Sequence, residues 1–521
     1  SAETNEYCWE TKMTSSKGPL SNRLAYLITL LSVCFSCLAQ TEGYYKDLFM
    51  DGGVGLTSRT TLPAADSLGL SWEYLASESQ NMQNAVIIGS DMDSNGWLLY
   101  PDGAPRFRTI YVNGGDAVPH YYALGEAGVE RIQAFYSGGS GYVGTCAGAI
   151  LSEIIWPGVM LGTGITGAGV YTGHFISPNS ALLNYSTFGD DMYISNIFHW
   201  GGVYADESNS LPPGTEILLR YDYTQHPSVD QRPSCWTYKE NDTTGRMLAI
   251  GSHPEGEILG EGLMLMESLL LYALDGCAPP EIKATLVNGE PRVMDKTYEE
   301  SNPQFTRIGD LQYHHYSFEV PEEAGSISIE LEAGEQYDIH LFADPDDYAF
   351  SGSAEASLTS GGSDHYFVIS DPEPGTWFIG VKGATTVEFT GISQLYIGDL
   401  SVLNGVEYTI TASWHTSDVT SISQDHVKAE SLSMLNNFPN PFNPTTTIEY
   451  ETLEASEVKL MVTDIQGHHI RTLVSESKAA GRYTVQWNGI DSEGTQVGTG
   501  IYFARIQSGN SSRVIKMIYL R

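Results

Sequence analysis

The chain has 521 residues, and its 26 Lys and Arg against 64 Asp and Glu give a formal net charge of −38 at pH 7. This length is too great for one ordinary domain, so we expect about three. So acidic a balance argues against nucleic acid and anionic membrane surfaces as partners.

Residues 1–39 have the pattern of a secretory signal. Three basic residues precede a short apolar run at 24–36, and small residues at a cleavage site end at Ala39. Cleavage there leaves Gln40 as the mature N-terminus. The apolar run is too short for a comfortable membrane span, and no later segment is apolar enough to cross a bilayer as a helix. We therefore expect a secreted protein, extracellular or attached to the outer-membrane surface, with no transmembrane helix after signal cleavage.

Removal of the signal leaves three cysteines, Cys146, Cys235 and Cys277. Three thiols in an exported protein leave one over after any pairing. One arrangement is a Cys235–Cys277 disulfide with Cys146 free, and the other is three free thiols. The sequence does not decide between them.

Residues 40–277 show an α/β pattern. Short buried strands are expected at residues 47–50, 84–88, 108–112 and 247–251, and helices around 129–136, 150–155 and 261–274. Strands that alternate with helices through glycine turns indicate a parallel sheet covered by helices on both faces. Ligands bind such sheets beyond the carboxyl ends of the strands.

One of those strand ends carries a cysteine between glycines. The segment Gly144-Thr145-Cys146-Ala147-Gly148 leaves a short β-prone run and enters a helix. A side chain on so tight a turn projects into solvent, as in the serine nucleophile elbow. The N-terminus of the following helix also favours a thiolate. These features predict Cys146 as a nucleophile rather than as a small apolar core residue.

A histidine and a carboxylate follow the strand at 247–251. In extended chain His253 and Glu255 project to the same side, and Pro254 disfavours a helix there. We expect His253 to face Cys146 as the base, with Glu255 orienting the imidazole. Glu257 is an alternative for that last role.

These motifs resemble the class I glutamine amidotransferase-like superfamily. Gly-Thr-Cys-Ala-Gly-Ala after a strand, with Ser-His-Pro-Glu downstream, fits the branch typified by the N-terminal domain of biotin–protein ligases. The segment 113–116 resembles that branch's oxyanion turn, and 199–204 resembles its aromatic-Gly-Gly-aromatic segment. The resemblance covers residues 44–276 and implies a flavodoxin-like α/β sheet.

The resemblance also implies roles for single residues. Cys146, His253 and Glu255 become a catalytic triad. The backbone N–H groups of Gly115 and Ala147 become the oxyanion hole. Two more sets of residues adjoin this site: Gly114 in the oxyanion turn, and His199 and Trp200, which we expect to shape the pocket.

No synthetase domain accompanies this unit, so glutamine-dependent biosynthesis is not expected. The sequence predicts a secreted or surface-attached cysteine hydrolase that acts on an amide-type bond of an unknown peptide or amide. The alternative is a non-catalytic surface protein that uses the same fold to bind a glycan or peptide. We expect no metal and no cofactor for either function.

The pattern becomes all-β after a connector at 278–304, which has a possible strand at 282–287. Alternating segments at residues 313–320, 326–331, 337–342 and 374–381 predict a β-sandwich at 305–414. This unit resembles the bacterial pre-peptidase C-terminal domain. Its acidic turn, with Asp344, Asp346 and Asp347, is either solvated or a calcium site, and the first reading is favoured.

A polar linker at 415–433 leads to the last unit, 434–521. Seven or so short strands and the run Asn437–Ile448 resemble the C-terminal sorting domain of the type IX secretion system. The resemblance implies a small immunoglobulin-like sandwich with the type IX secretion machinery as its partner. It further implies passage across the outer membrane, then removal of the domain or attachment at the surface.

Overall fold

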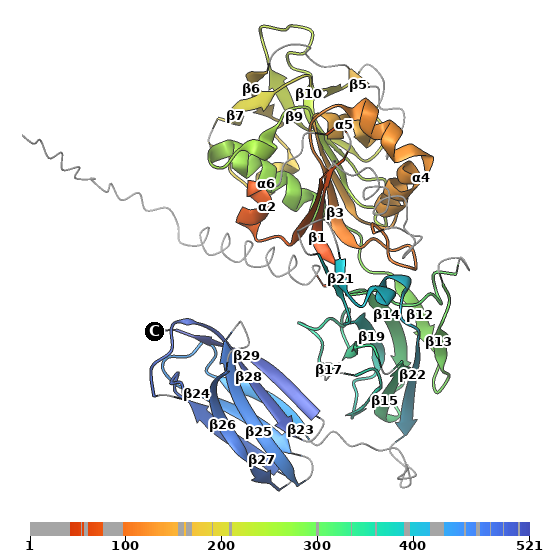
Figure 1. Ribbon diagram of the computed structural model, residues 1–521, viewed down its shortest axis with the longest axis vertical. Coiled ribbons are helices and arrows are strands. Elements are labelled where there is room, and N and C mark those ends of the chain that lie inside the picture. Colours follow the sequence, from red (N-terminus) through yellow and green to blue (C-terminus); the bar gives the residue numbers. More distant parts are fainter. Residues whose placement is uncertain are drawn as a thin grey trace, which may run out of the picture.

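A computed structural model gives the architecture of the chain (Figure 1). It describes residues 42–53, 55–56, 61–76, 97–154, 161–162, 169–189, 191–207, 211–297, 302–334, 336–359, 362–389, 396–416, 432–452, 455–464, 469–479, 481–492, 494–508 and 511–520. The signal segment, the strand expected at 84–88 and most of the linker lie outside the described residues.

The first unit is built on a nine-stranded sheet. Its order is β2 (Trp72–Ala76), β1 (Lys46–Gly52), β3 (Phe107–Val112), β4 (Gly141–Thr145), β11 (Met247–Ile250), β10 (Pro233–Tyr238), β9 (Thr215–Asp222), β6 (Val170–Ile176) and β7 (Tyr193–His199). The strands from β2 to β11 are parallel. Those from β11 to β7 are antiparallel.

The expected parallel sheet is therefore wrong for half of the strand pairings, and the sheet is mixed. The reason lies in the connections. Parallel neighbours need a crossover long enough for a helix, whereas β9, β10 and β11 follow one another through short turns that join antiparallel strands.

Helices cover both faces of this sheet, as expected (Figure 1). On one face lie α4 (Ala117–Ser137) and α5 (Ala147–Leu151), followed by a 3₁₀ turn at Ser152–Ile154. On the other lie α2 (Pro63–Leu68) and α6 (Gly260–Leu274). Successive side chains of β3 point to opposite faces of the sheet. Ile110 packs with residues of α4 and α5, and Tyr111 packs with residues of α2 and α6. Minor elements are a 3₁₀ turn at Ala181–Asn184 and the pair β5 (Leu161–Gly162) and β8 (Tyr204–Ala205).

The second unit is a sandwich of two sheets. One is β12 (Ile282–Leu286), β14 (Tyr313–Val320), β19 (Gly375–Gly383), β16 (Ile339–Asp344) and β17 (Ala356–Leu358), and the other is β13 (Arg292–Met294), β22 (Tyr408–Thr416), β15 (Ala324–Ala333) and β18 (His365–Ser370). Strands β12 and β13 lie in the segment 278–304, where we expected a connector with a possible strand at 282–287, and β12 corresponds to that strand. They extend the sandwich instead, by pairing with β14 and β22. The hairpin β20 (Val387–Phe389) and β21 (Tyr396–Gly398) and a 3₁₀ turn at Leu400–Asn404 complete the unit.

The third unit is also a two-sheet sandwich. One sheet is β23 (Leu432–Phe438), β24 (Thr446–Thr452) and β27 (Gly481–Trp487), and the other is β26 (His469–Lys478), β25 (Ser456–Asp464), β28 (Gly500–Ser508) and β29 (Ser511–Tyr519). The inner faces enclose a separate core around Trp487. This arrangement agrees with the expected immunoglobulin-like sandwich.

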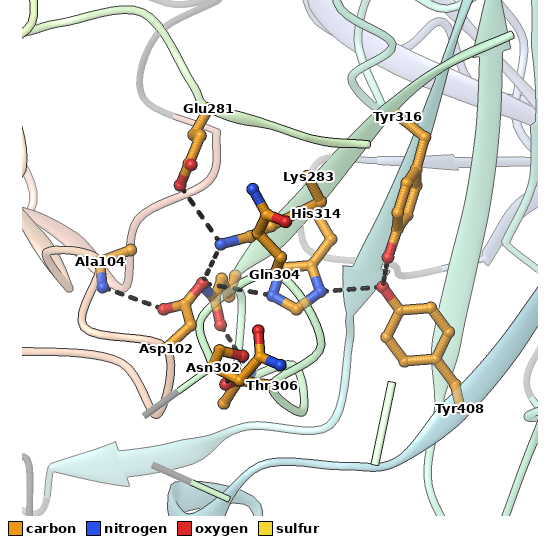
Figure 2. Close-up of polar contacts among 12 residues, drawn as sticks. Asp102, Ala104, Glu281, Lys283, Asn302, Gln304, Thr306, His314, Tyr316 and Tyr408 are labelled. Carbon is orange, nitrogen blue, oxygen red and sulfur yellow. Dashed lines mark hydrogen bonds and ion pairs between the residues drawn. The ribbon is translucent and has the colours of Figure 1, made fainter. Parts of the chain in front are cut away.

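A buried charge network joins the first two units (Figure 2). Lys283 Nζ on β12 lies 2.7 Å from Asp102 Oδ2, in the loop that precedes β3. His314 on β14 places Nε2 3.4 Å from the same oxygen and its other ring nitrogen 2.8 Å from the Tyr408 hydroxyl. A second buried pair, Arg106 with Asp310, crosses the same boundary. Since the apolar core is also continuous across it, the first two units pack as one body.

Candidate active site

Cys146 occupies a strained turn between β4 and α5. Its backbone has φ 49° and ψ −102°, a region that costs a residue with a side chain conformational energy. Glycine is required on both sides by close approach. A Cβ at Gly148 would lie 2.0 Å from the Val112 carbonyl oxygen, and one at Gly144 would lie 2.3 Å from the Gly148 carbonyl oxygen. The glycines thus allow the tight bend that the sequence pattern predicted. The expected projection of the side chain into solvent is wrong, because Cys146 is only 5% exposed.

His253 and Glu255 form a buried pair just after β11. Glu255 is 2% exposed, and its Oε1 lies 2.9 Å from His253 Nδ1. The extended chain expected here is wrong, because Pro254–Gly256 is a 3₁₀ turn. That turn, rather than strand alternation, brings the carboxylate back to the ring. The alternative, Glu257, instead has its side chain against α6, where a Cβ at Gly262 would lie 2.5 Å from Glu257 Cγ.

Cys146 and His253 converge on Gly114. A Cβ at Gly114 would lie 2.3 Å from His253 Cε1 and 3.4 Å from Cys146 Cβ. Burial by itself lowers the pKa of His253, but interactions with Cys146 and Glu255 raise it to about 10. The thiol to imidazole contact is loose: Cys146 Sγ donates to the Trp200 carbonyl oxygen at 3.3 Å, and His253 Nε2 has no partner of ordinary hydrogen-bond geometry among the described residues. Such contacts commonly tighten only when substrate is bound.

Two backbone N–H groups adjoin the thiol. Ala147 is the first residue of α5, so its N–H has no acceptor within the helix. Gly115 has φ 139° and belongs to the turn after β3. The turn and the elbow are tied together, since the Gly148 N–H donates to the Asn113 carbonyl at 3.2 Å. Within the described part of the chain, neither the Gly115 nor the Ala147 N–H has an acceptor.

The two remaining predicted residues, His199 and Trp200, differ in exposure. His199 is buried, with Nδ1 3.2 Å from Ser252 Oγ, and burial together with the His253 charge lowers its pKa to about 4. The Trp200 side chain is 59% exposed. Phe198 and Tyr221 were not identified from the sequence as residues of the site. The Phe198 ring centroid lies 5.6 Å from that of His253, and the Tyr221 ring centroid lies 5.3 Å from that of His199. An aromatic residue in a strand is ordinary, so no local signal marked them.

Four buried histidines predict acid sensitivity. Burial lowers the pKa of His174 and His315 to about 3 and that of His199 and His314 to about 4. Below about pH 6.5 the unfolded chain binds protons that the folded chain does not, so the free energy of unfolding should fall as pH drops from about 6.5 to about 4. Each such histidine contributes about 2 kcal/mol of loss at about pH 5.

Urea denaturation at about pH 7.5 and about pH 5 measures this loss. His253 does not add to it, because its raised pKa leaves it protonated in both states below about pH 6.5. The His174→Gln variant should show a smaller pH dependence. Equal stability at the two pH values would contradict the expectation.

Other candidate features lie apart from this site. A cavity of about 530 Å³ is lined by Pro105 and Gly138, which precede β3 and β4, and by His315 of the sandwich. The cavity therefore lies at the amino ends of these strands, whereas Cys146 lies at the carboxyl end of β4. Cys235 and Cys277 are both free and buried, so the disulfide alternative is not the one observed.

The acidic turn of the second unit is closed by hydrogen bonds within the turn. Asp344 Oδ1 accepts hydrogen bonds from the N–H groups of Asp346 and Asp347. Over the described residues no group of three or more potential ligands is placed to hold a metal.

No helix in the described part of the chain combines the length and the hydropathy that a membrane span requires.

Two family models match parts of the chain. The bacterial pre-peptidase C-terminal domain matches residues 312–383, within the second unit. The FlgD Ig-like domain matches residues 441–512, within the third. Neither covers half of the chain. No curated protein matches.

Glutamine amidotransferases are among the similar solved structures. One from Thermotoga maritima is 12% identical, covering 41% of this chain and 77% of that chain with a TM-score of 0.27. Another, from Methylobacillus flagellatus, is 10% identical, covering 41% and 72% with a TM-score of 0.28. The pre-peptidase C-terminal domain of a Bacillus anthracis collagenase is 11% identical, covering 26% and 99% with a TM-score of 0.16. At these values the likeness identifies neither a family nor an activity.

Proposed function

We propose that the chain is a cysteine hydrolase that cleaves an amide-type bond with Cys146, His253 and Glu255. The observation that carries this proposal is the convergence of three groups at the carboxyl ends of the neighbouring strands β4 and β11. They are a thiol on a strained elbow, an imidazole that meets it beside Gly114, and a buried carboxylate 2.9 Å from that imidazole. This is the arrangement of a nucleophile, a base and an orienting group.

The reaction follows from the positions of the protons. His253, whose pKa is raised to about 10, holds the proton of the Cys146 thiol, and Cys146 Sγ attacks the amide carbonyl carbon as the thiolate. Collapse of the tetrahedral intermediate breaks the C–N bond, and the imidazolium gives its proton to the leaving amine. Water, deprotonated by the now neutral His253, then attacks the thioester and frees the acid and the thiol.

Charge is stabilised at two points. Glu255 Oε1 accepts a hydrogen bond from the Nδ1–H of His253 and offsets the imidazolium charge. The N–H groups of Gly115 and Ala147 are proposed to hold the oxyanion, and each such donor typically lowers the barrier by about 3–4 kcal/mol.

Alkylation with iodoacetamide at neutral pH tests this proposal. Next to an imidazole that stays protonated at neutral pH, Cys146 should label stoichiometrically in the native protein. Cys235 and Cys277 are internal controls, because burial raises the pKa of both thiols, and they should label only after unfolding. Peptide mass mapping locates the label. A Cys146 that stays inert until denaturation would instead favour the non-catalytic binding protein.

We also propose that the protein is exported and sorted by the type IX secretion machinery to the cell exterior or the outer-membrane surface. Support comes from the signal-like segment 1–39 and from the motifs of 434–521, which resemble that system's sorting domain. The biotin–protein ligase branch of the amidotransferase-like superfamily remains the proposed relationship of the first unit.

A further inference from the structure

Strands β6 and β7 lie at the edge of the large sheet (Figure 1). They carry a row of aromatic side chains. Tyr171 pairs with Phe198, and Phe175 pairs with Tyr193. The ring centroids of the two pairs are 5.7 Å and 5.3 Å apart. Trp200 extends this line, 6.4 Å from Phe198. We call these five residues the aromatic row.

The aromatic row is not part of the core. Tyr171 is 67% exposed, Trp200 59% and Phe175 38%. The opposite face of the ribbon is the buried one, because Ile194 and Ile197 pack into the cluster that contains α6. A contiguous set of exposed large apolar side chains marks a binding surface more often than chance exposure does.

One end of the row reaches the candidate active site. The Phe198 ring lies 5.6 Å from that of His253, and the Trp200 carbonyl accepts the thiol of Cys146. From Tyr171 to Phe175 the strand rises by roughly 13 Å. A chain molecule lying along the row would therefore deliver one end to the thiol.

Two glycines and a carboxylate hold the row in place. A Cβ at Gly169 would lie 2.4 Å from Phe198 Cζ, and one at Gly173 would lie 1.9 Å from the Tyr193 hydroxyl oxygen. The Tyr193 hydroxyl donates to Asp222 at 2.8 Å. Rings fixed in this way lose little conformational entropy when a ligand stacks on them.

The chemistry of the surface selects a class of ligand. The strongly acidic chain disfavours anionic partners. An open row covers only one face of a ligand, whereas apolar side chains favour enclosed pockets. A pyranose ring matches such a surface, since its C–H face stacks on an aromatic ring while its hydroxyl groups stay in water or bond to a carboxylate such as Asp222.

We propose that the aromatic row binds a neutral oligosaccharide and that the amide presented to Cys146 is carried on a glycan. The second part rests on the proposed hydrolase function, and the first part does not. The hydrolase site thus gains an extended subsite on β6 and β7.

Calorimetric titration of the full chain with a hexamer of N-acetylglucosamine tests the binding, in the Cys146→Ala background so that nothing is cleaved. The hexamer should bind, and the Tyr171→Ala and Trp200→Ala substitutions should each weaken binding by roughly tenfold. Tyr122→Ala is the matched control, because Tyr122 is 78% exposed on α4, away from the row. It should leave the dissociation constant unchanged.

Absence of hexamer binding, or binding that survives loss of both rings, would overturn the assignment. Binding of a proline-rich peptide at the row in place of the hexamer would overturn it as well. Failure of the hydrolase proposal gives a different result. If iodoacetamide labels Cys146 but the hexamer does not bind, only the glycan proposal fails. If the hexamer binds but the Cys146 thiol is inert, only the hydrolase proposal fails.

Discussion

The Cys146→Ala variant is expected to lose turnover of any amide that the parent chain hydrolyses, by a factor on the order of 10⁶ in kcat. Without the thiol no acyl-enzyme forms, and His253 and the backbone N–H groups alone leave only weak catalysis. The fold should survive, because the substitution removes one atom from a side chain at a turn and keeps the glycines that permit the bend. Steady-state kinetics measures the loss of turnover, and thermal unfolding shows whether the fold survives.

Two further variants sharpen this result. Cys235→Ala should keep its turnover, since Cys235 is a free thiol on β10 and is not a member of the candidate triad. Glu255→Gln should lose less than Cys146→Ala, on the order of 10⁴-fold, because an orienting carboxylate contributes less than the nucleophile. A Cys146→Ala protein with parental activity would show that another group is the nucleophile.

The Lys283→Met variant should lower the free energy of unfolding by about 3–5 kcal/mol, because it leaves a buried carboxylate without its cation. The Asp102 side chain is 0% exposed and that of Lys283 is 4% exposed. Burial by itself raises the pKa of Asp102, but the Lys283 charge and the His314 contact hold it well below its usual range. Figure 2 shows Lys283 reaching Asp102 across the boundary between the first two units. Chemical denaturation measures the loss.

Lys296→Met is the matched control. Lys296 lies 3.4 Å from Asp295, and its side chain is 40% exposed, so its loss should change stability by less than about 0.5 kcal/mol. The double variant Asp102→Asn with Lys283→Met should recover at least about 1 kcal/mol relative to Lys283→Met alone. An additive double variant would mean that the ion pair does not contribute to stability as a pair.

The order of the local elements was predictable because each has a local cause. The short buried strand expected at 108–112 corresponds to β3, and the Leu-rich run at 261–274 corresponds to α6. Antiparallel pairing of β9, β10 and β11 was not predictable in this way. Strand direction depends on which segments become neighbours, and periodicity within one strand carries no information about its partner.

By itself, the sequence predicted the cysteine elbow, since glycines at 144 and 148 bracket Cys146. Gly144 is required by the nearby Gly148 carbonyl, whereas Gly148 is required by the Val112 carbonyl on β3. The sequence also determined that a histidine and a carboxylate follow β11. Only the tertiary structure decided that a 3₁₀ turn closes Glu255 onto His253 and that both groups meet the thiol beside Gly114. The exposure of the aromatic row and the burial of Asp102 with Lys283 were likewise decided by packing. Burial and long-range contact depend on how distant segments come together, which no window of sequence records.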